Sequence, residues 1–93
     1  MMPALSDTEV ATHLSALPMW RVDAGELVRA FQFGDFCAAL RFVNQVGVLA
    51  EAAGHHPDID IRYNKVRLAL VTHDAGGLTT KDFDLAAQVD QLS

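Results

Sequence analysis

The chain has 93 residues, of which 51% are hydrophobic and 20% are charged, with a formal net charge of -5 and a pI near 5.1. This length predicts one domain over residues 1–93, with a core small enough that self-association is a common source of stability. The acidic balance argues against direct nucleic-acid binding, because such a surface needs clustered Lys and Arg to replace counterions.

The number of cysteines and the length of the apolar segments indicate the cellular location of the protein. The single cysteine, Cys37, cannot form an internal disulfide, and the start of the chain lacks the basic region and apolar segment of a secretory signal. The longest mostly apolar stretch, residues 42–53, is interrupted by polar side chains and is shorter than the roughly 20 residues that span a bilayer. We therefore expect a cytoplasmic protein that does not enter a membrane, with Cys37 as a small buried hydrophobe.

The first predicted element is a helix. Ser6 and Glu9 have the spacing of a capping box, in which each side chain accepts a hydrogen bond from the other residue's backbone. Pro18, which lacks a backbone N–H, is expected to end this helix. The apolar positions of the helix recur at helical spacing and are Val10, Leu14 and Leu17.

Two strands are expected next, at residues 20–22 and 26–33, joined by the turn-forming segment Asp23-Ala24-Gly25. The face of the second strand that carries Val28 is otherwise small or polar, so burial there is expected to be partial. This strand is also the candidate for an open edge of the sheet. Gly34-Asp35 then begins a long helix that ends at Gly54.

A second hairpin and a final helix complete the chain. Residues 59–63 and 65–72 are expected to form strands around a tight turn near Asn64, with His73 on the face opposite the core. Thr79 is the expected N-cap of the last helix. The order α-β-β-α-β-β-α predicts an α+β fold, in which a mostly antiparallel sheet carries the helices on one side. The residues expected on the core face of the fourth strand are Val66, Leu68 and Leu70.

Three of the four histidines lie close together: His55 and His56 precede Pro57 and Asp58, and His73 follows the second strand pair. Because Pro57 disfavours helical angles at the preceding residue, the doublet is expected in the loop after the long helix, where catalytic side chains are often held. Imidazole has an ordinary pKa close to neutrality, so the cluster indicates proton transfer near physiological pH.

Two simpler interpretations apply to the same histidines. They can act as loop residues that cap strand and helix ends. They can also bind zinc, but adjacent side chains in an extended segment point to opposite sides, and no cysteine or H-x-x-E-H pattern completes a ligand set. We therefore expect no metal site.

The chain from Trp20 onward carries an ordered set of short motifs. They are Phe31-x-Phe33-x-x-Phe36, Ala50-Glu51, His55-His56-Pro57-Asp58, Tyr63-Asn64-Lys65-Val66, Thr72-His73-Asp74, Gly77-Leu78-Thr79 and Lys81-Asp82. This combination resembles the pterin-4a-carbinolamine dehydratase family, which includes the dimerisation cofactor of a homeodomain transcription factor. One departure is Ile59, where family members often have a tryptophan that lines the pterin site or fills space.

The resemblance implies a four-stranded antiparallel sheet with three helices on one face. It also implies an enzyme, a hydro-lyase that removes water from a 4a-hydroxytetrahydropterin to give the quinonoid dihydropterin, with no redox cofactor or metal. By carry-over, His55 and His73 are the candidate acid and base, and His56 is the candidate that orients the pterin ring. The full set of residues expected to bind the substrate is His55, His56, Pro57, Thr72, His73, Asp74, Asp82 and Glu51.

Two acids in that set have both a functional and an ordinary interpretation. Glu51 either orients an imidazole or is a solvated helix residue; Asp82 either contacts pterin nitrogens or favours the positive end of a helix. His13 is expected on the surface. The aromatic residues expected in the core are Trp20, Phe31, Phe33, Phe36 and Phe83.

The resemblance also implies partners. Family members form dimers through the sheet and, in some cases, tetramers through helices, so we expect a homo-oligomer. An aromatic amino-acid hydroxylase is one candidate for the metabolic partner, and the sequence leaves another pathway open. The alternative functions are a dimerisation adapter for a transcription factor and a pterin-binding module without turnover.

Overall fold

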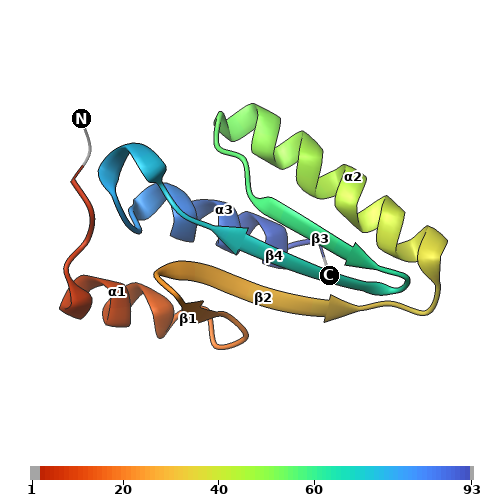
Figure 1. Ribbon diagram of the computed structural model, residues 1–93, viewed down its shortest axis with the longest axis horizontal. Helices are drawn as coiled ribbons and strands as arrows, with labels where there is room; N and C mark the ends of the chain where they lie inside the picture. Colours follow the sequence, from red (N-terminus) through yellow and green to blue (C-terminus); the bar gives the residue numbers. More distant parts are fainter. Residues whose placement is uncertain (1–2, 93) are drawn as a thin grey trace.

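The structure is a computed structural model that describes residues 3–92 (Figure 1). Its element order confirms the predicted α-β-β-α-β-β-α arrangement and adds one short 3₁₀ helix, η1, before the last α-helix. The elements are α1 (Asp7–Leu14), β1 (Arg21–Asp23), β2 (Glu26–Gln32), α2 (Phe36–Ala53), β3 (Asp58–Arg62), β4 (Lys65–Leu70), η1 (His73–Ala75) and α3 (Thr80–Asp90).

The capping box at the start of α1 is confirmed. The Glu9 backbone N–H donates to the Ser6 hydroxyl at 3.2 Å, and the Ser6 N–H donates to a Glu9 carboxylate oxygen at 2.9 Å. The predicted end of this helix was wrong, because α1 ends at Leu14, four residues before Pro18. Leu17 is nevertheless buried, since the turns that follow the helix fold its side chain into the core.

Both predicted ends of α2 are confirmed. The Asp35 carboxylate accepts a hydrogen bond from the Ala38 N–H at 2.8 Å, which caps the helix start. Gly54 has a φ of 62° in the left-handed region, which glycine adopts without steric cost, and it stops the helix. Residue 54 therefore fixes the direction in which the chain leaves α2 toward β3.

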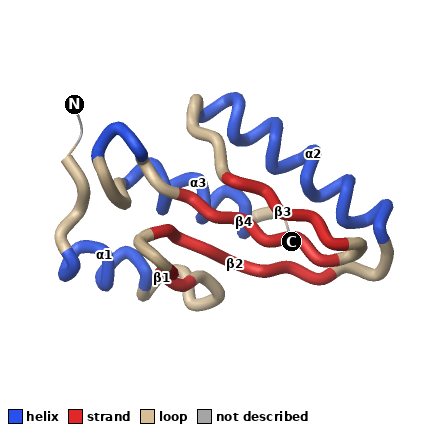
Figure 2. Tube along the Cα trace, viewed as in Figure 1, coloured by secondary structure: helices blue, strands red, loops and turns tan. Residues whose placement is uncertain are grey.

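The four strands form one antiparallel sheet in the order β1-β2-β4-β3 (Figure 2). The expectation that β2 lies at an open edge was wrong. The short strand β1 pairs along one side of β2 through a tight turn in which Ala24 and Gly25 both have positive φ, while β4 pairs along the other side. The open edges of the sheet are consequently β1 and β3.

The core lies between one face of this sheet and the helices. Phe31 of β2 contacts Phe42 of α2 with ring centroids 4.6 Å apart, and Leu68 at the centre of β4 is fully buried. The exposed His13 ring of α1 stacks on Phe83 of α3 at 5.1 Å, which places α1 beside α3. These contacts and the views in Figures 1 and 2 agree with three helices on one side of the sheet.

Two burial predictions were wrong. Phe36 is 44% exposed and Cys37 is exposed, because both lie in the first turn of α2 on flanks that do not face the sheet.

The expected partial burial on the outer face of β2 is confirmed, because Val28 is completely buried whereas Ala30 and Gln32 are exposed. Val28 is opposite Arg21 of β1 and Ala69 of β4, so neighbouring strands flank it on both sides.

The helix α2 is long and apolar enough, by length and composition alone, to cross a membrane. The core helix of a globular domain meets the same criterion. Here the helix contacts β4 and α3. The residues of its buried stripe are Ala39, Phe42, Val46 and Ala50.

Candidate active site

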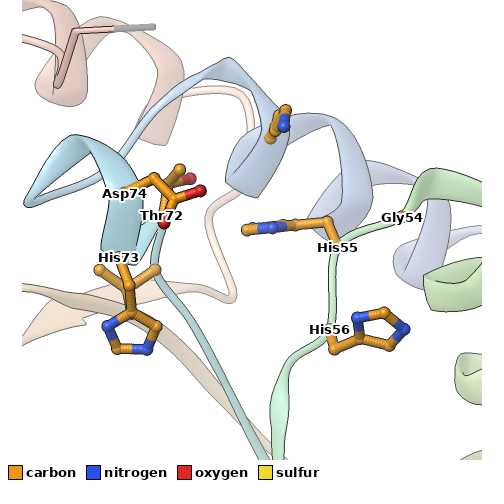
Figure 3. A pocket seen from close by; sticks show the side chains of 8 residues that line it. Gly54, His55, His56, Thr72, His73 and Asp74 are labelled. Carbon is orange, nitrogen blue, oxygen red and sulfur yellow. The ribbon is translucent and has the colours of Figure 1, made fainter. Parts of the chain in front are cut away.

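A cavity of about 250 Å³ opens between two loops and the start of α3. One wall comes from the loop that joins α2 to β3, and the other from the end of β4 and η1 (Figure 3). The lining residues are Gly54, His55, His56, Val71, Thr72, His73, Asp74 and Lys81.

The pairing of β3 with β4 brings these two loops together. Because the strands are antiparallel, Asp58 at the start of β3 lies opposite Ala69 near the end of β4. The residues just before β3 and just after β4 therefore meet at one end of the sheet. The bridge between Thr72 and Gly77 then closes the loop that carries His73.

His55 is the buried histidine of the cavity. Its side chain is 11% exposed, and its Nε2 atom lies 2.5 Å from Oδ1 of Asp82, whose side chain is completely buried. The other carboxylate oxygen, Oδ2, accepts hydrogen bonds from the Thr72 hydroxyl and the Thr79 backbone N–H, each at 2.9 Å. A buried acid in the first turn of α3 thus holds an imidazole from a loop 27 residues earlier.

The same acid completes a capping box at the start of α3. Thr79 is the N-cap, as predicted, and its hydroxyl accepts a hydrogen bond from the Lys81 N–H at 3.3 Å. The hydroxyls of Thr79 and Thr72 are 2.8 Å apart. Hydrogen bonds therefore link four side chains at one wall of the cavity, those of His55, Thr72, Thr79 and Asp82. Each of them finds a partner inside the protein, as buried polar groups require.

His56 and His73 lie at the exposed part of the cavity. His56 Nε2 is 3.1 Å from a carboxylate oxygen of Glu51, and the two side chains are 61% and 80% exposed. In Figure 3 the rings of His55 and His56 extend to opposite sides of their loop, as alternation along an extended segment predicts. The His73 ring makes no hydrogen bond with another residue in the 3–92 range.

Five of the eight residues expected to bind a ligand line the cavity: His55, His56, Thr72, His73 and Asp74. Glu51 and Pro57 do not line it, and Glu51 is the partner of His56 on the solvent side. Asp82 does not line it either; because both of its oxygens bind protein groups, the geometry does not favour the direct contact with ligand that was expected.

Several residues of the site were not anticipated. Lys81 and Val71 line the cavity, and Thr79 lies behind it in the hydrogen-bonded group. The T-x-x-D spacing of Thr79 and Asp82 was the available signal for the second capping box. Ile59, the departure from the expected family pattern, lies on β3 opposite Leu68 and is not among the lining residues.

No three His, Cys, Asp or Glu side chains among residues 3–92 are grouped so that they could hold a metal ion. The cavity instead presents imidazoles, one acid and one lysine around a space of small-ligand size. Such groups can donate and accept protons at a bound ligand.

The model of the family described as Pterin 4 alpha carbinolamine dehydratase matches residues 3–92. The chain belongs to this family. Membership of the pterin-4a-carbinolamine dehydratases assigns it to the hydro-lyases of pterin metabolism and confirms the resemblance seen in the motifs.

Similar bacterial proteins extend over nearly the whole chain. A Chloroflexus aurantiacus protein provisionally named pterin-4-alpha-carbinolamine dehydratase is 60% identical over 91 residues, which is 98% of each chain. A protein of Acidobacterium capsulatum with the same provisional name is 59% identical, over 98% of this chain and 99% of its own.

Two solved structures share the fold. A protein described as a transcriptional coactivator/pterin dehydratase from Brucella melitensis has a TM-score of 0.91 and 34% identity, over 96% of this chain and 97% of its own. A pterin dehydratase-like protein described as a RuBisCO assembly factor in the alpha-carboxysome has a TM-score of 0.64 and 26% identity, over 78% of this chain and 84% of its own.

Proposed function

We propose that this protein catalyses the dehydration of a 4a-hydroxytetrahydropterin to the quinonoid dihydropterin. The observation that carries the proposal is a single cavity lined by His55, His56 and His73, which come from two loops. Family membership supplies the substrate class.

The reaction needs one proton delivered and one removed. Hydroxide is a poor leaving group, so an acid protonates the oxygen on C4a as the C–O bond breaks and water departs. The lone pair of the neighbouring ring nitrogen forms the new C=N bond, and a base then takes the proton from that nitrogen. A positioned acid or base typically contributes about 10²- to 10⁴-fold in rate.

The geometry supports different roles for the three histidines. His55 is nearly buried and held by Asp82, which suits a group whose orientation must be fixed. His73 lies on the opposite loop with no hydrogen bond to another residue in the described range, so its ring nitrogens can serve a ligand. We assign the acid and base roles to His55 and His73, and the orientation of the pterin ring to the exposed His56. Thr72 and Asp74 complete the proposed binding wall.

An assay of 4a-carbinolamine dehydration, following the appearance of the quinonoid product with and without the protein, tests the activity. His55→Ala and His73→Ala should each reduce kcat by about 10²-fold or more. His56→Ala should raise KM more than it reduces kcat. Near-normal turnover in both of the first two variants would show that the proposed acid and base are wrong.

Self-association is also part of the proposal. The outer flank of α2 exposes Phe36, Leu40 and Val48, and the adjacent edge strand β3 exposes Ile59 and Ile61. The unpaired edge of β3 can extend the sheet with a second copy, and the α2 flank can pack against another helix. Sedimentation at micromolar concentration should show a dimer or tetramer; a monomer would contradict this part.

The reaction also suggests where its substrate originates. The 4a-hydroxylated pterin is the kind of product that a pterin-dependent aromatic amino-acid hydroxylase releases, so we propose such an enzyme as the metabolic partner. A cytoplasmic location accompanies this proposal, since the chain has a single cysteine, and that residue is a free thiol.

The exposed α2 flank is the one observation that favours the adapter function as a second candidate. A variant in which alanine replaces both His55 and His73 separates the catalytic function from the adapter function. Loss of turnover with retained binding to a partner protein would support an adapter role beside catalysis.

A further inference from the structure

We infer that the two buried hydroxyls of Thr72 and Thr79 fix the hydrogen of neutral His55 on Nε2, so that Nδ1 is the ring nitrogen that exchanges a proton with the ligand. The catalytic consequence depends on the proposed function. The position of the hydrogen on the ring does not, and it is tested separately below.

The direction of each hydrogen bond follows from the number of hydrogens available. A threonine hydroxyl has one hydrogen, and Thr72 gives its hydrogen to Oδ2 of Asp82 at 2.9 Å. In the 2.8 Å contact between the two hydroxyls, Thr79 must therefore be the donor and Thr72 the acceptor. The Thr79 oxygen in turn accepts the Lys81 backbone N–H. The two hydrogen bonds therefore run in one direction: Thr79 donates to Thr72, and Thr72 donates to Asp82.

This series of hydrogen bonds determines whether Asp82 accepts a hydrogen bond from His55 or donates one to it. Oδ2 already accepts two hydrogen bonds, one from Thr72 and one from the Thr79 backbone N–H. The carboxylate is completely buried, so these donors take the place of water in stabilising its negative charge. Its remaining oxygen, Oδ1, is then an acceptor for Nε2 of His55 at 2.5 Å.

An acceptor at Oδ1 requires a hydrogen on Nε2. A neutral imidazole carries only one hydrogen, so Nδ1 keeps its lone pair and can accept a proton from the pterin. The imidazolium that results has both hydrogens, and Asp82 stabilises it through the same contact. Thr72 and Thr79 are thus positioning residues, which act on the ligand through Asp82 and His55.

The position of the hydrogen is measured in the unmodified protein. Two-dimensional ¹H–¹⁵N spectra of the imidazole rings, recorded at a pH where His55 is neutral and assigned with His55→Gln, distinguish the two neutral tautomers. We expect the hydrogen of His55 on Nε2. A spectrum with the hydrogen on Nδ1 would overturn the inference, whether or not the protein turns over a carbinolamine.

The contribution of the hydroxyls is measured with paired variants. Thr72→Val removes the hydroxyl at nearly constant volume, and we expect a mixed His55 tautomer with kcat reduced by about 10- to 100-fold and KM changed less. Thr72→Ser keeps the hydroxyl, so the His55 hydrogen should stay on Nε2 and kcat should be higher than in Thr72→Val. Thr79→Ser should give the same tautomer as the unmodified protein.

The matched control is Thr12→Val, since the Thr12 hydroxyl donates only to the Thr8 carbonyl on the exposed face of α1. It should change neither the His55 spectrum nor kcat. Should Thr72→Val fail to fold, the spectrum of the unmodified protein still tests the position of the hydrogen, and Thr79→Val, which removes the hydroxyl that donates to Thr72, tests the role of the hydroxyls. A folded Thr72→Val protein with the original tautomer and full kcat would overturn the role of the hydroxyls.

Discussion

The Nε2 atom of His55 lies 2.5 Å from Oδ1 of Asp82, and this contact joins the loop after α2 to the first turn of α3. The same carboxylate accepts the Thr79 N–H and completes the capping box of α3. One side chain therefore stabilises the start of a helix and positions an imidazole of the cavity. Substitutions that disturb the first turn of α3 should therefore alter the position of His55 in the cavity, even where the substituted residue does not contact the ligand.

Asp82→Asn removes the negative charge of this side chain while keeping its size. In the amide, an NH2 group replaces one of the two carboxylate oxygens, and this group donates hydrogen bonds instead of accepting them. At least one of the donors around residue 82 therefore loses its acceptor. We expect a loss of about 1–3 kcal/mol in the free energy of unfolding and a reduction in kcat of about tenfold or more. Chemical denaturation and steady-state kinetics measure the two effects. Full activity at unchanged stability would show that the carboxylate charge is not required.

Glu51→Gln should have a small effect. The pair formed by Glu51 and His56 is highly exposed, and such surface pairs contribute about 0–1 kcal/mol. We expect kcat to change by less than about fivefold, which is the factor that 1 kcal/mol corresponds to. A reduction as large as that of His55→Ala would instead show that Glu51 acts directly in the reaction.

Acidic conditions should remove the contribution of the α1 capping box. Hydrogen bonds from the Ser6 backbone and then from its hydroxyl lower the pKa of Glu9 below its ordinary value of 4.5. Ionised Glu9 therefore stabilises the folded state above pH 4.5, and this contribution is lost as the pH falls through the lower pKa of the folded state.

Unfolding experiments with Glu9→Gln over this pH range measure that contribution. The variant should be less stable than the unmodified protein at neutral pH and equally stable in strong acid. A constant difference across the range would contradict the assignment. Asp7→Asn, in the same exposed turn of α1, is the control for a general loss of negative charge.

Charge on the outer flank of α2 should disrupt self-association. Val48 is 69% exposed and the buried stripe of α2 does not include it, so Val48→Lys should leave the protomer folded. We expect the sedimentation coefficient to shift toward the monomer with little change in circular dichroism. Ala52→Lys, at an exposed position nearer the end of the same helix, tests whether the effect depends on the apolar patch. An unchanged oligomer in the Val48 variant would place the interface elsewhere, with the β3 edge as the remaining surface.

Local patterns in the sequence determined most of the elements. Helix caps at Ser6, Asp35 and Thr79, and the stop at Gly54, act over a few residues, so their spacing is visible without the fold. The alternation of Val66, Leu68 and Leu70 likewise identified the buried face of β4. The histidine doublet before Pro57 and the later His73 indicated one site, because hairpin topology brings the ends of neighbouring strands together.

Tertiary structure decided what depends on contacts between distant segments. Strand order placed β2 at the centre, and packing of α2 left Phe36 and Cys37 exposed, since neither outcome follows from the period of one segment. The pairing of His55 with Asp82 spans 27 residues and becomes visible only when the first turn of α3 lies behind the cavity. The sequence by itself determined which groups could move protons. The fold decided which of them is buried and held in place, because burial and hydrogen bonding are properties of the assembled layers.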